Sequence, residues 1–111
     1  FAVARGQSSH HPEDLMLRLI VAPQAEADLR DAFMWYETKA AGLGHDFLRR
    51  VETRLDQIAS SPHLFRLRRH RFRLAPVERF PYAIYFIWDE TSGSAVVGRV
   101  LHFKQDSRPR T

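Results

Sequence analysis

The chain has 111 residues, of which 44% are apolar and 27% are charged, a balance typical of one globular domain rather than a disordered chain. It contains no cysteine, which excludes disulfide bonds and thiolate chemistry and is usual in a reducing compartment. The formal net charge of +4 suits an anionic partner, either nucleic acid or an acidic protein segment.

Residues 1–15 show no hydrophobic periodicity and precede Met16. They lack the apolar segment of a signal peptide, so we expect a leader or a vector-derived extension there, followed by a single domain over residues 16–111. No apolar run approaches the roughly 20 residues that cross a bilayer. We therefore expect a cytoplasmic protein without membrane contact.

A short strand and a helix are expected first. Apolar side chains alternate over residues 17–21, which predicts a strand with one apolar face. Pro23 suits the first position of a helix, and Gly42 suits a left-handed cap after its end. The apolar stripe of this helix recurs every three or four residues and consists of Ala25, Leu29, Phe33 and Tyr36.

A second helix is expected over residues 44–60, where Pro62 follows its end. Its apolar face consists of Phe47, Leu48, Val51, Leu55 and Ile58. Because only a few residues join the two helices, they are expected to form an antiparallel hairpin.

Strands follow the helices. The arginine-rich residues 66–73 lead into a strand in which Arg71 and Arg73 alternate with apolar residues, and Pro76 indicates an edge position or an early stop. Residues 80–88 are apolar on both faces, which predicts a strand in the middle of a sheet. The turn "DETSGS" then leads to an antiparallel partner strand over residues 95–103.

The order of elements predicts an α+β fold: an N-terminal strand, a helical hairpin and a three-stranded antiparallel meander, with the helices packed on one sheet face. The histidines share no metal-ligand spacing, and no glycine-rich phosphate loop is present, so we expect neither a metal nor a cofactor. The basic residues 66–73 fit RNA phosphates, with His70 or His102 in acid–base cleavage, or the carboxylates of a partner protein, or a solvated strand face.

Four segments, in this order and spacing, resemble the RelE/ParE superfamily of toxins from type II toxin–antitoxin modules: "APQAEADLRDAFMWYE", "GLGHDFLRRVETRLDQIASSPHLF", "RRHRFRLAPVERFPYAIYFIWDE" and "VVGRVLHFKQD". The resemblance implies two mechanisms on one fold. RelE-like members cleave mRNA in the ribosome, whereas ParE-like members poison DNA gyrase, and fold alone does not choose between them.

Residue matching favours the ParE-like branch. The strand positions that carry basic residues in the RelE branch fall on Leu74 and Pro76, and its arginine after the aromatic Tyr82 is replaced by Ala83. The late catalytic arginine falls near Gln105, and "SRPRT" offers no terminal tyrosine. If the chain is nevertheless a ribonuclease, the resemblance leaves His102, Lys104 and Arg79 for the catalytic roles.

The resemblance therefore implies a toxin that is neutralised by a cognate ParD-like antitoxin in a hetero-oligomer and that binds gyrase or, alternatively, the ribosome and mRNA. A non-toxic protein-binding module is the remaining alternative. We expect target binding by Arg71, Arg73, Arg79, Tyr82, His102, Lys104, Asp106 and Arg108. We expect antitoxin binding by Met34, Trp35, Leu43, Arg49 and Arg50.

Overall fold

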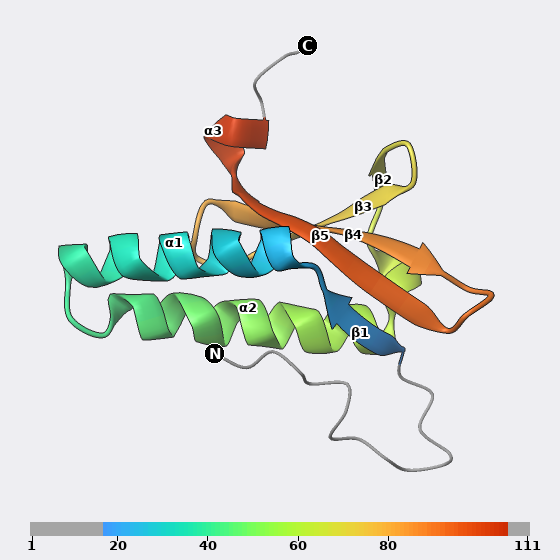
Figure 1. Cartoon of the computed structure of the whole chain (residues 1–111), viewed down its shortest axis with the longest axis horizontal. Helices are drawn as coiled ribbons and strands as arrows, with labels where there is room; N and C mark the ends of the chain where they lie inside the picture. The colour runs from blue at the N-terminus through green and yellow to red at the C-terminus, as the bar shows by residue number, and fades with distance from the viewer. Residues whose placement is uncertain (1–16, 107–111) are drawn as a thin grey trace.

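The computed structural model describes residues 17–106, with the backbone alone at Arg69 and Asp106, so the expectation for residues 1–15 lies outside the described residues. Within these residues, two long helices follow a short strand, and then come a 3-10 helix, four further strands and a short helical turn (Figure 1). The elements are β1 (Arg18–Val21), α1 (Pro23–Lys39), α2 (Leu43–Ser60), the 3-10 helix η2 (Pro62–Leu64), β2 (Leu67–Arg69), β3 (Phe72–Pro76), β4 (Tyr82–Asp89), β5 (Ser94–His102) and α3 (Phe103–Asp106).

Within the described residues, five strands form one sheet in the order β1-β5-β4-β3-β2. β1 runs parallel to β5, whereas all the other neighbours are antiparallel. The strand predicted to be central is β4, which lies between β3 and β5 and buries Ile84 and Phe86 on one face and Ala83 and Tyr85 on the other. The predicted α+β class and the helices on one sheet face are confirmed (Figure 1).

The prediction of three strands after the helices is wrong by one strand. Residues 67–76 form a tight hairpin of β2 and β3, so the arginine-rich segment is not the approach to a single strand. The hairpin turns at His70, whose φ of 53° is unusual for a residue other than glycine. Arg71 therefore lies in the turn, and Arg73 alone of the expected pair lies in β3. Pro76 ends β3, as expected, and pairs only with β4.

The helical hairpin is held by its glycines and by Glu37. Gly42 has a φ of 88°, as predicted for a left-handed cap, and the Glu37 carboxylate accepts the N–H groups of Gly42 and Gly44 at 3.1 and 2.8 Å. These hydrogen bonds lower the pKa of Glu37 below its ordinary value. A side chain at Gly44 would lie 2.6 Å from the Phe33 carbonyl oxygen, so the two helices require glycine at their closest approach.

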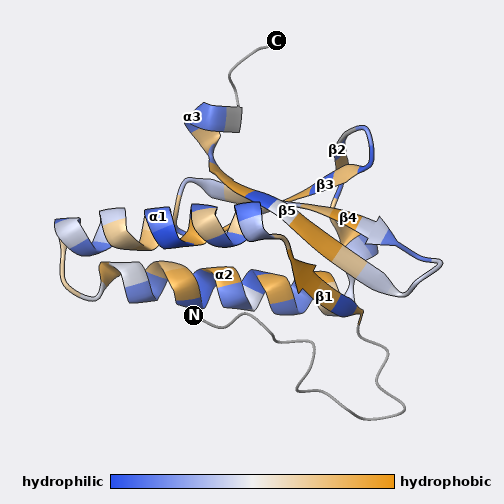
Figure 2. Cartoon of the chain, viewed as in Figure 1, coloured by the Kyte–Doolittle hydropathy of each residue, from blue (hydrophilic) through white to orange (hydrophobic). Residues whose placement is uncertain are grey.

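The core lies between the helices and the sheet. The apolar stripes of α1 and α2 point inward, while polar residues cover their outer faces (Figure 2). Phe47, Val51, Leu55 and Ile58 of α2 are buried, as is Leu29 of α1. They pack against a sheet face formed by Leu19, Ala75, Ile84, Phe86, Ala95, Val97 and Val100.

We predict that replacing Ile84 or Phe86 by alanine lowers the free energy of unfolding by about 2–5 kcal/mol, because each fully buried side chain would leave a cavity. Ile87→Ala is the matched control, since Ile87 is on the same strand but half-buried, and its loss should be clearly smaller. Denaturant unfolding monitored by circular dichroism measures all three. A loss below about 1 kcal/mol at Ile84 would contradict a central β4.

Candidate functional site

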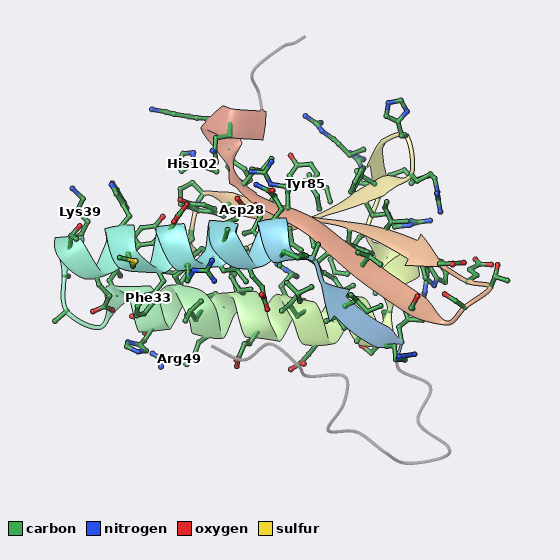
Figure 3. All side chains as sticks on the ribbon, in the orientation of Figure 1. Asp28, Phe33, Lys39, Arg49, Tyr85 and His102 are labelled. Atoms are coloured by element: carbon green, nitrogen blue, oxygen red, sulfur yellow. The ribbon has the colours of Figure 1, made fainter. Side chains whose placement is uncertain are left out.

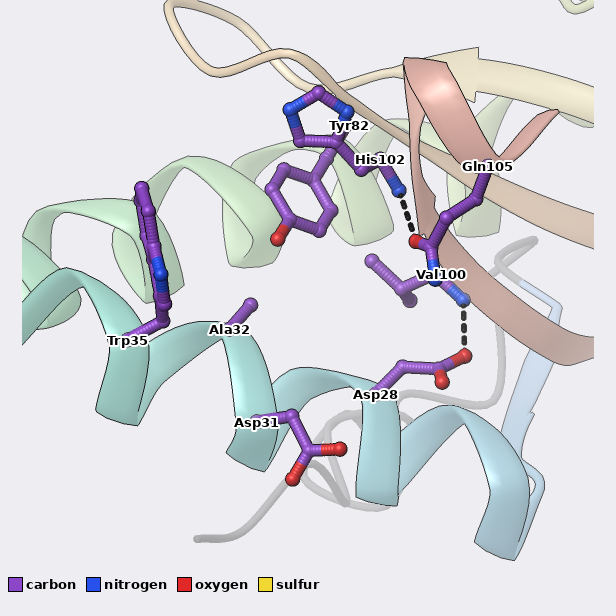
Figure 4. A pocket seen from close by; sticks show the side chains of 8 residues that line it. All are labelled: Asp28, Asp31, Ala32, Trp35, Tyr82, Val100, His102 and Gln105. Carbon is purple, nitrogen blue, oxygen red and sulfur yellow. Dashed lines mark hydrogen bonds between the residues drawn. The ribbon is translucent and has the colours of Figure 1, made fainter. Parts of the chain in front are cut away.

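A cavity of about 310 Å³ lies between α1 and the carboxyl-terminal end of β5. Figure 4 shows the side chains around it. Helix α1 contributes Asp28, Asp31 and Trp35 on one side, and Tyr82 of β4 and His102 of β5 lie on the other. Ala32, Val100 and Gln105 complete the lining.

The cavity borders the part of β5 that β1 does not cover. β1 pairs with β5 only from Ser94 to Val97, and the Ala22 N–H closes this pairing by donating to the Val97 carbonyl at 2.9 Å. Farther along β5, side chains instead of β1 accept the backbone hydrogen bonds of this edge. The Val100 N–H donates to Asp28 at 2.8 Å, and the His102 N–H donates to Gln105 Oε1 at 2.9 Å. The edge is thereby satisfied without a neighbouring strand.

Asp28 also holds Arg99. The Arg99 Nε and Nη2 atoms donate to its two carboxylate oxygens at 2.8 and 3.0 Å, the fork geometry that gives strong Arg–carboxylate pairs. The Asp28 side chain is 13% exposed and that of Arg99 is 41% exposed, so the carboxylate is largely removed from water. Hydrogen bonding to Asp28 raises the pKa of the Arg99 guanidinium above its ordinary value.

Tyr82 connects the cavity to the aromatic part of the core. Its ring contacts Phe47, Tyr36 and His102 at centroid distances of 5.0, 6.1 and 5.1 Å. In Figure 4 its hydroxyl points into the space above α1. Burial raises the pKa of this hydroxyl, and the charges of Asp28 and Asp31 raise it further. Tyr82 therefore stays neutral and offers a hydroxyl group to a ligand.

His102 has one ring nitrogen engaged. Its Nδ1 atom accepts the Lys104 N–H at 3.0 Å, which places the ring proton of the neutral form on Nε2. The next residue along the chain joins this end of β5 to the loop before β4, because the Phe103 N–H donates to the Pro81 carbonyl at 2.8 Å. That loop carries Arg79, which is exposed and has a φ of 74°.

Comparison with known protein families shows which family the chain belongs to. The family model described as the ParE toxin of the type II toxin–antitoxin system parDE matches residues 19–107. The chain belongs to the ParE toxin family. A solved structure titled "Chromosomal ParDE TA system from P. aeruginosa" matches with a TM-score of 0.69 and 14% identity, covering 80% of this chain and 98% of that one. No curated protein matches.

In the structure of this ParE family member, the predicted target-binding residues lie in two separate regions. Tyr82 and His102 face each other at the cavity, and exposed Lys104 follows them in α3. The Arg71–Arg73 segment lies at another position of the sheet, since Arg73 pairs with Phe86 rather than with the start of β4. The backbone of Asp106 ends α3, and Arg108 lies outside the described residues.

Arg73 is engaged within the molecule. Its Nη1 atom donates to the Phe65 carbonyl at 2.7 Å, and its guanidinium group lies 5.3 Å from the centre of the Trp88 ring. The side chain is half-buried. Arg73 is therefore committed to contacts within the chain, whereas Arg71 is exposed in the turn before β3.

The predicted antitoxin-binding residues differ in how exposed their side chains are and in whether they form ion pairs. Met34 and Trp35 are 61% and 53% exposed on α1, as large apolar side chains at an interface would be. Leu43 instead packs partly against the core. Arg49 forms an ion pair with Asp46, and Arg50 lies 3.3 Å from Glu78.

Sequence reasoning missed Asp28, Asp31 and Gln105 as parts of the site. A signal was present, because Asp28, Asp31 and Trp35 follow each other at spacings of three and four residues and so share one helix face. Within residues 17–106, no group of three histidine, cysteine or acidic side chains is placed to hold a metal ion. No helix in that range is long and apolar enough to cross a membrane.

We predict that Asp28→Ala lowers the free energy of unfolding by about 2–4 kcal/mol, because the Val100 N–H loses its partner and Arg99 loses its counter-charge. Asp46→Ala is the control. Asp46→Ala also removes the aspartate of an arginine pair, but the side chains of Asp46 and Arg49 are both more than half exposed. The free energy of unfolding should therefore fall by less than about 1 kcal/mol. Equal losses in denaturant unfolding would contradict a structural role for Asp28.

Proposed function

We propose that the chain is the toxin of a type II toxin–antitoxin module, arrests growth by binding DNA gyrase in the cytoplasm, and is neutralised by a cognate ParD-like antitoxin. The match of the ParE family model to residues 19–107 is the observation that carries this proposal. In this proposal the target is contacted by the half-buried side chains of Tyr82 and His102 at the end of β5 and by exposed Lys104 in α3.

The charge of the cavity supports a protein target rather than RNA cleavage at His102. Metal-free cleavage of RNA requires a base, an acid and a cation for the developing phosphate charge. Asp28 and Asp31 line the same cavity as His102, and neither arginine nor lysine is among its described lining residues. Carboxylates at this position repel a phosphate backbone, and Arg79 is not part of the lining.

The exposed apolar residues of α1 support neutralisation by a partner protein. Met34 and Trp35 lie side by side in the chain, and Trp35 also lines the cavity that contains Tyr82 and His102. An antitoxin bound to this part of α1 would therefore also cover the proposed target-binding end of β5. Such a mechanism requires no conformational change in the toxin.

We predict that expression of the full chain without antitoxin stops growth and accumulates gyrase–DNA cleavage complexes, and that His102→Ala and Lys104→Ala weaken both effects at least about tenfold. Glu90→Gln in the β4–β5 turn is the control and should remain fully toxic. Lys104 and Glu90 are exposed, so their changes should shift stability by only about 0.5 kcal/mol. Circular dichroism checks the fold of His102→Ala, whose ring contacts Tyr82.

Cleaved mRNA on ribosomes instead of gyrase complexes would contradict the proposed target. In that case His102→Ala should lower the cleavage rate by about 10²-fold or more. A chain that accumulates to high level alone, without slowing growth, would contradict the toxin proposal itself.

A further inference from the structure

The cavity at the end of β5 has a charge opposite to that of the chain. The chain carries a formal charge of +4, yet among the described residues that line the cavity the charged side chains are those of Asp28 and Asp31. The other polar groups are the hydroxyl of Tyr82, the ring of His102 and the amide of Gln105. The cavity therefore suits a cationic ligand rather than an anionic one.

One of the two carboxylates is available. Asp28 is already bound by Arg99 and by the Val100 N–H. Asp31 is exposed and forms no ion pair with any residue that the structure describes. Its field nevertheless reaches across the cavity, because it contributes to the raised pKa of the Tyr82 hydroxyl. A cation in the cavity would thus meet a negative charge that forms no ion pair within residues 17–106.

Trp35 adds an aromatic face to the same space. In Figure 4 the indole stands on the wall opposite His102 and borders the cavity. The ring already attracts a cation, since the Lys39 ammonium group lies 4.7 Å from its centroid. Lys39 lies farther along α1, away from Asp28 and His102 (Figure 3), and is not part of the cavity lining. The side of the indole that borders the cavity therefore remains open.

The volume of the cavity and the chemistry of its lining indicate which kind of cation it suits. A metal ion is disfavoured, because the described residues offer no group of three suitable ligands. The volume of about 310 Å³ lies at the lower end of the range of small-molecule sites, about 300–1,000 Å³, and suits one long side chain. A guanidinium group is planar, stacks on an indole, binds a carboxylate with two donors and is less strongly hydrated than an ammonium group.

We propose that the cavity receives the guanidinium group of an arginine from the antitoxin, stacked against Trp35 and paired with Asp31. The proposal rests on the proposed function, which supplies the partner. A toxin with a charge of +4 attracts a mainly acidic partner segment, and such a segment is repelled locally by the unpaired carboxylate of Asp31. An arginine at that point of the segment removes the repulsion and fixes its register on the toxin.

The test uses the full chain labelled with ¹⁵N and N-acetyl-arginine amide as the probe. The chain has two tryptophans, so two indole N–H signals are expected in the NMR spectrum, one from Trp35 at the cavity and one from Trp88 next to Arg73. We expect saturable shifts of the Trp35 signal with a millimolar dissociation constant, and no shift at Trp88. N-acetyl-citrulline amide has nearly the same shape without the charge and should shift neither.

Two variants and two matched controls decide the role of the side chains. Asp31→Asn and Trp35→Leu should weaken arginine binding at least about fivefold, the first by removing the charge and the second by removing the ring. Glu90→Gln removes a distant exposed carboxylate, and Leu64→Ala removes a distant exposed apolar side chain. Both controls should bind arginine as tightly as the original chain. Because Trp35→Leu removes the indole signal, binding to that variant is followed through the NMR signals of the His102 ring.

Three results would overturn the proposal. Equal shifts with arginine and citrulline would exclude a cation site, and unchanged binding in Asp31→Asn would exclude its assigned partner. Tenfold tighter binding when Arg108 and Arg110 are both replaced by glutamine would mean that the chain's own arginines occupy the cavity. Growth assays separate this test from the proposed function, because a non-toxic original chain with normal arginine binding would contradict only the function.

Discussion

The carboxylate of Asp28 is the contact on which the shape of the site depends. β1 is too short to accompany β5 along its whole length, because the chain leaves the sheet after Val21 to begin α1 at Pro23. The uncovered edge of β5 would present an unpaired Val100 N–H, and Asp28 accepts it from one turn inside the helix. Arg99, at the preceding position of β5, then balances the buried charge. Helix and strand are thereby held at a fixed separation, and the cavity lies beside this contact.

A second constraint is aromatic. Tyr36 of α1, Phe47 of α2, Phe80 and Tyr82 pack together, with ring centroids of neighbouring pairs 5.0 to 6.1 Å apart. This cluster joins both helices to the start of β4 and leaves the hydroxyl end of Tyr82 at the cavity. Tyr82 thus serves the core with its ring and the site with its hydroxyl, as partly buried tyrosines do at interfaces. A change at Tyr82 would alter stability and binding together, whereas Asp31 and Trp35 can be changed with little effect on the core.

The sequence predicts those parts of the fold that rest on local periodicity. The stripe of α2, the cap at Gly42 and the apolar β4 follow from spacing and composition alone. The β2–β3 hairpin was missed because its turn uses His70 at a positive φ instead of glycine, and alternating arginines resemble an uninterrupted strand. The Asp28–Arg99 pair joins residues 71 positions apart, and no local pattern indicates such a contact. Tyr82 and His102, both predicted to bind the target, line the cavity, but the sequence did not predict the acidic side chains that α1 adds to it.

That acidic wall changes how the positive charge of the chain is understood. A uniformly basic surface would bind any polyanion, and its affinity would depend mainly on salt concentration. Here Arg73 is held by Phe65 and Trp88, Arg99 by Asp28, and Arg49 and Arg50 by acidic side chains of the same chain. These arginines are thus committed to internal contacts, while Asp31 and Trp35 border the cavity. A partner that matches this arrangement has to place its own charges in a defined order, which is a requirement that a folded or folding protein segment meets and a nucleic acid backbone of uniform negative charge does not.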